Sequence, residues 1–250
     1  MTQLLPAMVL VVLTVSLVPA QGQQNRCAEC HVANPRAPGR GHLMDWDLSA
    51  HKRSGIGCER CHGGDAAASG VLRAHMGILM PPNTASLVSR KNVSATCGTC
   101  HVAPYSAFQK SRHYDLLKAG DTKGPTCVTC HGEAAAQLLS PDAIAGECNQ
   151  CHGSGKRAPR PGRAAQAREL LERVRDLRAQ LDAARRVIDE VRDTARQRQL
   201  RDAYDQAEAP LNQAVTAGHS FVFADSEARL AVARERTAAL YQSIICTTGH

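Results

Sequence analysis

The chain has 250 residues, a formal net charge of +7 and only 3% aromatic residues. Its basic residues are mostly interleaved with acidic ones, so we expect a solvated surface and no nucleic-acid-binding patch. Beyond the first 20 residues no segment is apolar enough to span a membrane, and the scarcity of aromatic side chains argues against an ordinary protein core in the N-terminal half.

Residues 1–20 predict a secretory signal peptide. No charged side chain precedes Arg26, the apolar stretch is short, and Val18-Pro19-Ala20 fits a small-residue cleavage site. An uncleaved membrane anchor is the alternative, although the stretch between Pro6 and Pro19 is shorter than the ~20 residues that span a bilayer. We therefore expect a protein that is periplasmic or otherwise exported, with membrane association allowed but not required.

Residues 21–152 contain five copies of Cys-x-x-Cys-His. The first cysteines are Cys27, Cys58, Cys97, Cys127 and Cys148, the second are Cys30, Cys61, Cys100, Cys130 and Cys151, and the adjoining histidines are His31, His62, His101, His131 and His152. With 11 Cys and 11 His in the chain, chance predicts roughly 0.02 copies. Each copy is the attachment signature of a c-type haem, whose vinyl groups bind both thiols while the histidine becomes the proximal iron ligand. The motifs thus predict five covalently bound haem c groups.

Zinc sites and disulfides are the alternative interpretations of paired cysteines. A zinc site needs two such pairs, so five pairs leave one over, and neither alternative explains a histidine after every second cysteine. Cys246 stands outside the motifs. We favour a buried thiol on an apolar helix face for Cys246, with a disulfide between two chains as the alternative.

About 130 residues serve five haems, too few to build an ordinary core around such large groups. We therefore expect helical turns and loops with almost no sheet, and haems that take the place of a core. Six further histidines are candidates for the distal iron ligands, of which we predict His42, His51, His75, His113 and His219 and discard the terminal His250 first. Met44, Met76 and Met80 are alternative ligands.

Residues 153–162 have the composition of a linker, and 163–250 predict a long-helix hairpin. From 163 to 209 the chain lacks Gly and Pro and repeats apolar residues in heptad steps, which predicts one rod of roughly 65–70 Å. We expect Pro210 to kink or restart this helix, Gly218 to interrupt it, and Asp225 or Ser226 to cap a final helix. The apolar seam can pack on the haem region or pair with a second copy of the chain. The predicted fold is therefore mainly α: a loop-rich multihaem region followed by the hairpin.

One stretch resembles a superfamily of multihaem cytochromes c. It runs from Cys97-Gly98-Thr99-Cys100-His101 through Ser111-Arg112-His113-Tyr114 to Cys127-Val128-Thr129-Cys130-His131-Gly132-Glu133. The superfamily includes pentahaem nitrite reductase, octahaem hydroxylamine oxidoreductase and the latter's small tetrahaem electron acceptors. The resemblance implies closely stacked, mostly bis-His haems and subunit contacts through the C-terminal helices. The Cys-x-x-Cys-Lys motif of the nitrite reductases does not occur here, so no catalytic residue is carried over.

Two functions follow from these features. An iron held by two histidines has no open position for a substrate, so we predict a cytochrome that relays single electrons between redox protein partners. The alternative is an oxidoreductase acting on a small nitrogen or sulfur species, which requires one haem with an open distal side. Such a haem would result if His42, His75 or His219 were not a ligand, and the sequence leaves the question of enzymatic activity open.

A third role, a helical subunit of a larger redox assembly, follows from the apolar seam.

Overall fold

The structure, a computed structural model, describes residues 25–121, 123–134 and 140–248. Helices and connecting loops make up these residues, and no strand occurs among them, so the prediction of a mainly α fold is confirmed. None of the described helices combines the length and the apolar character that crossing a bilayer requires. The predicted signal peptide and His250 lie outside the described residues.

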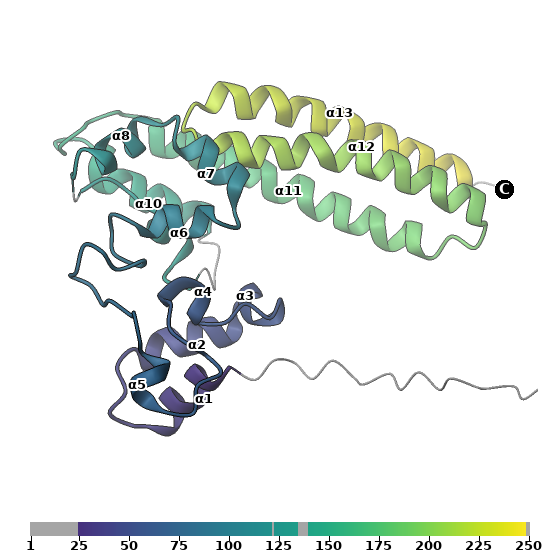
Figure 1. Cartoon of the computed structure of the whole chain (residues 1–250). Helices are drawn as coiled ribbons and strands as arrows, with labels where there is room; N and C mark the ends of the chain where they lie inside the picture. Colours follow the sequence, from purple (N-terminus) through teal and green to yellow (C-terminus); the bar gives the residue numbers. More distant parts are fainter. Residues whose placement is uncertain (1–24, 122, 135–139, 249–250) are drawn as a thin grey trace, which may run out of the picture.

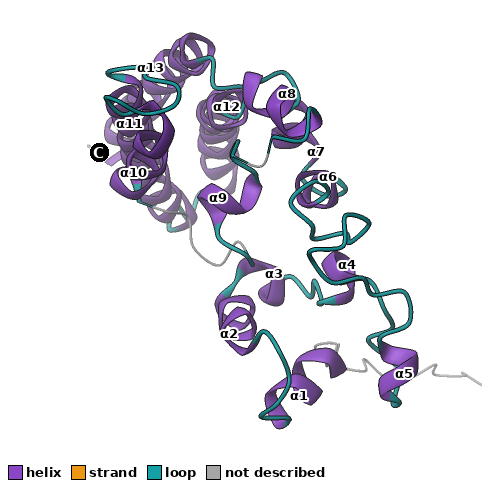
Figure 2. Cartoon of the chain, turned by 90° about the vertical axis from the view of Figure 1, so that its left-hand side faces the viewer, coloured by secondary structure: helices purple, strands orange, loops and turns teal. Residues whose placement is uncertain are grey.

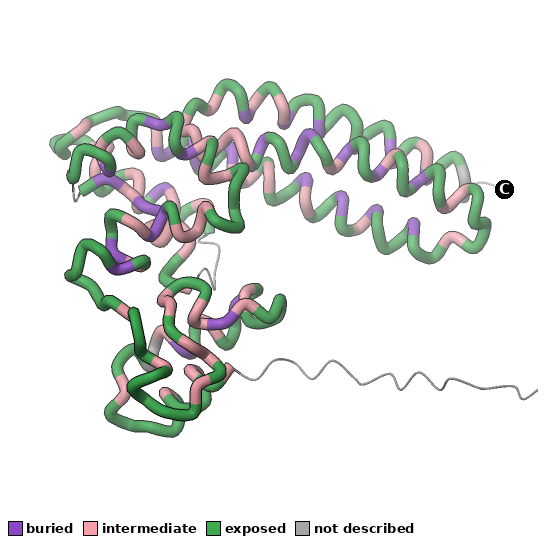
Figure 3. Tube along the Cα trace, in the orientation of Figure 1, coloured by how far each residue is buried: buried purple, intermediate pink, exposed green. Residues whose placement is uncertain are grey.

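Short helices make up the N-terminal part of the fold. They are α1 (Arg26–Ala33), α2 (Arg40–Leu48), α3 (Ala50–Arg53), α4 (Glu59–His62), α5 (Val71–Ala74), α6 (Val93–Gly98), α7 (Val102–Phe108), α8 (Arg112–Lys118), α9 (Cys127–His131) and α10 (Pro141–His152). Helices α1 to α5 form the end of the molecule far from the C-terminal helices, and α6 to α10 lie between (Figures 1 and 2). Exposed and half-exposed residues dominate α1 to α5 (Figure 3), so the polypeptide alone builds little core there.

Three long helices pack side by side in the C-terminal part (Figure 1): α11 (Arg163–Asp189), α12 (Thr194–Gly218) and α13 (Phe223–Thr248). Their facing stripes form the hydrophobic core, which consists of Leu170, Leu177, Leu181, Ala184, Ile188, Leu200, Tyr204, Ala207, Leu211, Ala214, Leu230, Ala233, Leu240 and Ile244. Burying a Leu or Ile side chain contributes about 1.5–3 kcal/mol, so this bundle has its own source of stability.

The expected single rod over 163–209 is wrong, because the chain turns between Asp189 and Thr194. Asp193 caps the second helix: its carboxylate accepts hydrogen bonds from the backbone N–H groups of Ala195 (2.8 Å) and Arg196 (2.9 Å). This cap satisfies donors that a helix start leaves without partners.

Helix α12 continues through Pro210, so the expected restart at this residue is also wrong. A proline removes the hydrogen bond to the carbonyl four residues earlier, here that of Gln206. The side chain of Arg236 on α13 donates to this carbonyl oxygen at 3.1 Å and replaces the lost bond. A neighbouring helix thus makes the proline tolerable inside α12.

The end of α12 at Gly218 agrees with the predicted interruption. The expected caps of the last helix are wrong, since α13 begins at Phe223 and Ser226 is a buried residue that donates to the carbonyl of Ala214 (3.0 Å). Cys246 is exposed, which contradicts the expected buried thiol. The buried face of α13 ends at Ile244, and a step of two residues turns a side chain to the opposite side of a helix.

Candidate haem-binding sites

The structure places each of the five predicted distal histidines beside one proximal histidine, and we name the resulting pairs sites A to E. Site A contains His31 and His75 (ring centres 6.0 Å apart), site B His62 and His42 (5.5 Å), site C His101 and His51 (5.9 Å), site D His131 and His219 (6.2 Å) and site E His152 and His113 (5.9 Å). The pairs were not predictable individually, because distal and proximal residues interleave along the chain.

The spacing within each pair fits an iron between the two rings. An imidazole nitrogen lies about 2 Å from a bound metal and about 1 Å from its own ring centre, so two rings on one metal have centres about 6 Å apart. All five separations, from 5.5 to 6.2 Å, agree with this value. Burial also lowers the pKa of His62, His113 and His131, which favours the neutral ring that a metal requires.

The second ring nitrogen of most distal histidines is held by an oxygen atom. Nδ1 contacts the Glu133 carboxylate in His42 (3.3 Å) and backbone carbonyls in His51 (3.1 Å), His75 (2.8 Å) and His219 (3.0 Å). A metal-binding histidine usually donates its other N–H in this way, which fixes the tautomer and leaves Nε2 for the metal. His113 differs, because its buried Nδ1 has no hydrogen-bond partner among the described residues.

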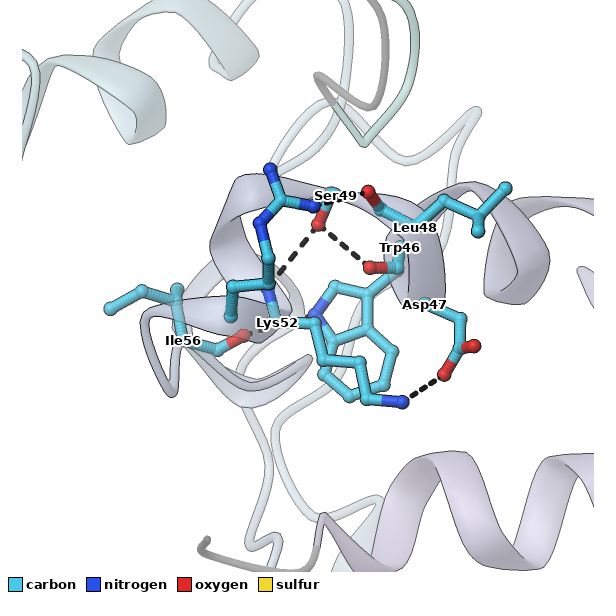
Figure 4. A network of polar contacts seen from close by, with 7 residues as sticks. Trp46, Asp47, Leu48, Ser49, Lys52 and Ile56 are labelled. Carbon is cyan, nitrogen blue, oxygen red and sulfur yellow. Dashed lines mark hydrogen bonds and ion pairs between the residues drawn. The ribbon is translucent and has the colours of Figure 1, made fainter. Parts of the chain in front are cut away.

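A buried serine two residues earlier orients His51. Ser49 is the N-cap of α3: its hydroxyl accepts from the Lys52 backbone N–H (3.3 Å) and donates to the Trp46 carbonyl (2.7 Å), as Figure 4 shows. The Trp46 indole in turn donates to the carbonyl of Ile56 (2.9 Å), which closes the loop ahead of the second haem motif. His51 therefore sits in the first turn of a capped helix.

The same device recurs at His113. Ser111 is the buried N-cap of α8, and its hydroxyl accepts from the Tyr114 backbone N–H at 3.1 Å. The Ser-x-His pattern that the sequence shows twice is thus a helix start that fixes a candidate ligand.

The turn between α12 and α13 reaches two sites at once. His219 stacks on His131 with an angle of 6° between the rings, while the Phe221 ring lies 4.3 Å from His113. Phe221 also has a φ of +59°, an uncommon conformation for a bulky residue. Helix α12 contacts α7 beside this turn (Figure 1), so the C-terminal bundle is attached to the haem region at sites D and E. No pattern in the sequence singles out Phe221.

The predicted linker at 153–162 is part of site E. His152 Nδ1 contacts the carbonyl of Ala158 (2.7 Å), and the backbone N–H of Arg160 donates to the His152 carbonyl (3.0 Å). Because α10 and α11 also contact each other, this segment is a tight connection that supports the proximal histidine.

Thiols of consecutive motifs lie near one another. The neighbouring pairs are Cys27 with Cys58, Cys61 with Cys100, Cys97 with Cys127, and Cys130 with Cys148. Burial and then the nearby thiol raise the pKa of Cys58 and of Cys130 to about 11, while a hydrogen bond from Cys97 lowers the pKa of Cys127. Helix contacts agree, since α9 touches both α6 and α10. The five motifs therefore follow one another in space in the order of the sequence.

Large apolar side chains near the sites are left uncovered by the polypeptide. They include Val32, Met44, Leu48, Val71, Leu72, Met76, Leu79, Met80 and Val102, with Leu72 92% exposed. Porphyrin faces are apolar surfaces that such side chains can cover. The methionines considered as alternative ligands are in this group, and each of the five proximal histidines has a histidine neighbour instead.

The alternative interpretations of the cysteines find little support. A structural zinc site requires four ligands, and among the residues that the structure describes no group of three or more Cys, His, Asp or Glu side chains is placed to hold a metal ion. None of the motif cysteines forms a disulfide within the part of the chain that the structure describes.

Comparisons with known proteins point to the same cofactor. The family described as cytochrome c7 and related cytochrome c matches residues 83–153, and the family described as cytochrome c554 and c-prime matches residues 13–63. Between them, these segments contain all five Cys-x-x-Cys-His motifs. A curated relative, the C-type polyheme cytochrome OmcC of Geobacter sulfurreducens, is 30% identical over 131 residues, or 49% of this chain. The chain spans only 16% of that relative's length, and no solved structure gives a significant match.

Together, the motifs and these matches support a multihaem c-type cytochrome, a class of electron-transfer protein with covalently bound haem c.

Proposed function

We propose that this chain is an exported pentahaem cytochrome that relays single electrons through five bis-His haems. The observation that carries the proposal is the set of five histidine pairs, each formed by one motif histidine and one distal histidine at about the separation that an intervening metal requires. When bound, the haem supplies a reversible one-electron change at iron.

The residues of the chain then have separable roles. The motif cysteines would tether each macrocycle and the paired histidines would bind its iron, while the hydrogen bonds at Nδ1 fix the orientation of the distal rings of His51, His75 and His219. The spatial succession of motifs supports a linear relay, because each site neighbours the next one in the sequence. Sites A and B also share a hydrogen bond between Asn25 and Glu59 (3.0 Å), which flank their first cysteines.

The observed pairing favours this carrier over the oxidoreductase alternative. That alternative requires one proximal histidine without a distal partner, through the loss of His42, His75 or His219 as a ligand. Each of these three rings lies within 6.2 Å, centre to centre, of a motif histidine. Two histidine ligands leave iron without an open position, so this pairing supports the proposal of a carrier.

The remaining parts of the proposal concern where the protein works and with what. Covalent haem attachment takes place outside the cytoplasm, so export through the predicted signal peptide at 1–20 is part of the proposal. Redox proteins are the proposed partners, and the exposed apolar residues at the α5 end offer them access to site A. Pairing of two copies through the C-terminal helices is a weaker proposal, because the apolar stripes of these helices are already buried against one another.

Mass spectrometry and spectroscopy of the matured protein test the proposal. The expected results are a mass increase equal to five haems, an entirely low-spin oxidised spectrum, and no binding of cyanide or nitric oxide by the oxidised protein. Fewer haems would contradict the count. A high-spin haem that binds cyanide would contradict complete bis-His ligation and support the oxidoreductase.

A further inference from the structure

Residues Glu133 and Ala134, which we call the junction segment, join three of the five sites. They follow His131 of site D in the sequence. Nevertheless, Oε2 of Glu133 lies 3.3 Å from Nδ1 of His42 in site B, and the carbonyl oxygen of Ala134 lies 3.1 Å from Nδ1 of His51 in site C. These contacts connect residues 91 and 83 positions apart, so they depend on the fold and not on local sequence.

The contact made by Glu133 differs from those at the other distal histidines. His51, His75 and His219 meet neutral backbone carbonyls, and His113 Nδ1 has no partner among the described residues. A carboxylate is the stronger acceptor, because one partner of the hydrogen bond is charged. It pulls the Nδ1 proton toward itself and makes the opposite nitrogen a better donor to a metal.

We infer that Glu133 is a positioning residue for His42 and that it lowers the reduction potential of the haem at site B below the value that a neutral acceptor would give. The inference rests on the proposed bis-His ligation. A stronger axial donor stabilises oxidised iron relative to reduced iron, and hydrogen bonding to an axial ligand is one of the levers that set haem potentials.

The solvent exposure of the Glu133 side chain limits the distance over which its charge acts. The Glu133 side chain is 75% exposed and the His42 side chain 32%, so solvent screens the charge of Glu133 at longer range. The direct hydrogen bond is screened much less. Its effect therefore belongs to site B alone, and the haem at site D, although close to Glu133 in the sequence, is expected to change little.

Spectroelectrochemistry of the holo-protein, with electron paramagnetic resonance to follow each haem, tests this inference. Glu133→Gln keeps the size of the side chain and removes its charge. The expected result is about a tenfold change in the reduction equilibrium of one haem, equivalent to about 59 mV in the positive direction for a one-electron couple. Glu133→Asp keeps the carboxylate and is expected to recover part of the shift.

Asp45→Asn is the matched control. Asp45 is exposed and lies one turn after His42 on α2, so the variant removes a charge at a similar place without touching the hydrogen bond. Its potentials should equal those of the wild type. Equal shifts in Glu133→Gln and Asp45→Asn, or a low-spin site B whose potential does not move in Glu133→Gln, would overturn the inference and leave the proposed function intact. A site B that is not low-spin in the wild-type protein would overturn both.

Discussion

Replacing Ser49 by Ala tests how the fold holds a distal ligand in place. The hydroxyl is fully buried, caps α3 through the Lys52 backbone N–H and donates to the Trp46 carbonyl. Loss of an N-cap costs about 0.5–2 kcal/mol, typically near 1, and the second hydrogen bond brings the expected cost to the upper half of that range. The loss destabilises the local helix conformation that holds His51 in site C, because the cap and His51 belong to the same turn of helix.

The expected consequence is weaker binding of His51 to the iron at site C. A difference of 1–2 kcal/mol changes a population ratio by about 5–30-fold. We therefore expect carbon monoxide, which must displace His51, to bind the reduced variant at site C about 5–30-fold more tightly than it binds the wild type. Carbon monoxide titration followed by optical spectroscopy measures this affinity, and His51→Ala identifies the site C signal.

Ser111→Ala is the internal control, since it removes the equivalent cap from α8 and should affect only site E. The interpretation of Ser-x-His as a ligand-placing cap would be refuted if Ser49→Ala left carbon monoxide affinity unchanged. It would also be refuted if both serine variants altered the same haem.

Three further outcomes follow from the bundle. Leu181→Ala, at a position with no exposed surface, should lower the free energy of unfolding by about 2–5 kcal/mol in urea titrations, and a smaller loss would mean that the core around it collapses to fill the space. Arg236→Ala should lower the free energy of unfolding by about 0.5–1 kcal/mol in the same measurement. The loss should be smaller in a Pro210→Ala background, because a backbone N–H then donates to the Gln206 carbonyl again. An equal loss in both backgrounds would contradict the proposed replacement of that hydrogen bond. The third outcome concerns the protein produced without haem attachment. Because the hydrophobic core lies in the bundle, hydrogen exchange should find protected amides in α11 to α13 and rapid exchange in α1 to α9. Protection in α1 to α5 would show that this region folds without its cofactor.

The sequence alone predicts the proximal residues and the pool of distal ones. The five motifs name their own cysteines and histidines, and the histidines left over after discarding His250 are just numerous enough to supply one distal partner each. The Ser-x-His pattern at Ser49 and Ser111 is visible in the sequence, but its role as a capped helix start comes from the structure.

The pairing of the histidines and the positions of the helix breaks cannot be predicted from local sequence patterns. His42 precedes its partner His62, whereas His75 follows its partner His31, and nothing local distinguishes the two arrangements. Sequence alone predicts a kink or restart at Pro210, because the hydrogen bond that replaces the lost one comes from Arg236 on another helix. The sequence does not single out Asp193 as a cap, since aspartate also occurs inside helices.

The interleaved pairing has a consequence for how the protein is made. A chain exported from its N-terminus presents both histidines of a site only once the later of the two has emerged. The sites would then be completed in the order B, A, C, E and D, since their later histidines are His62, His75, His101, His152 and His219. Site D therefore stays half-coordinated until the chain has passed through as far as His219, and its closure by the α12–α13 turn completes the last of the five sites.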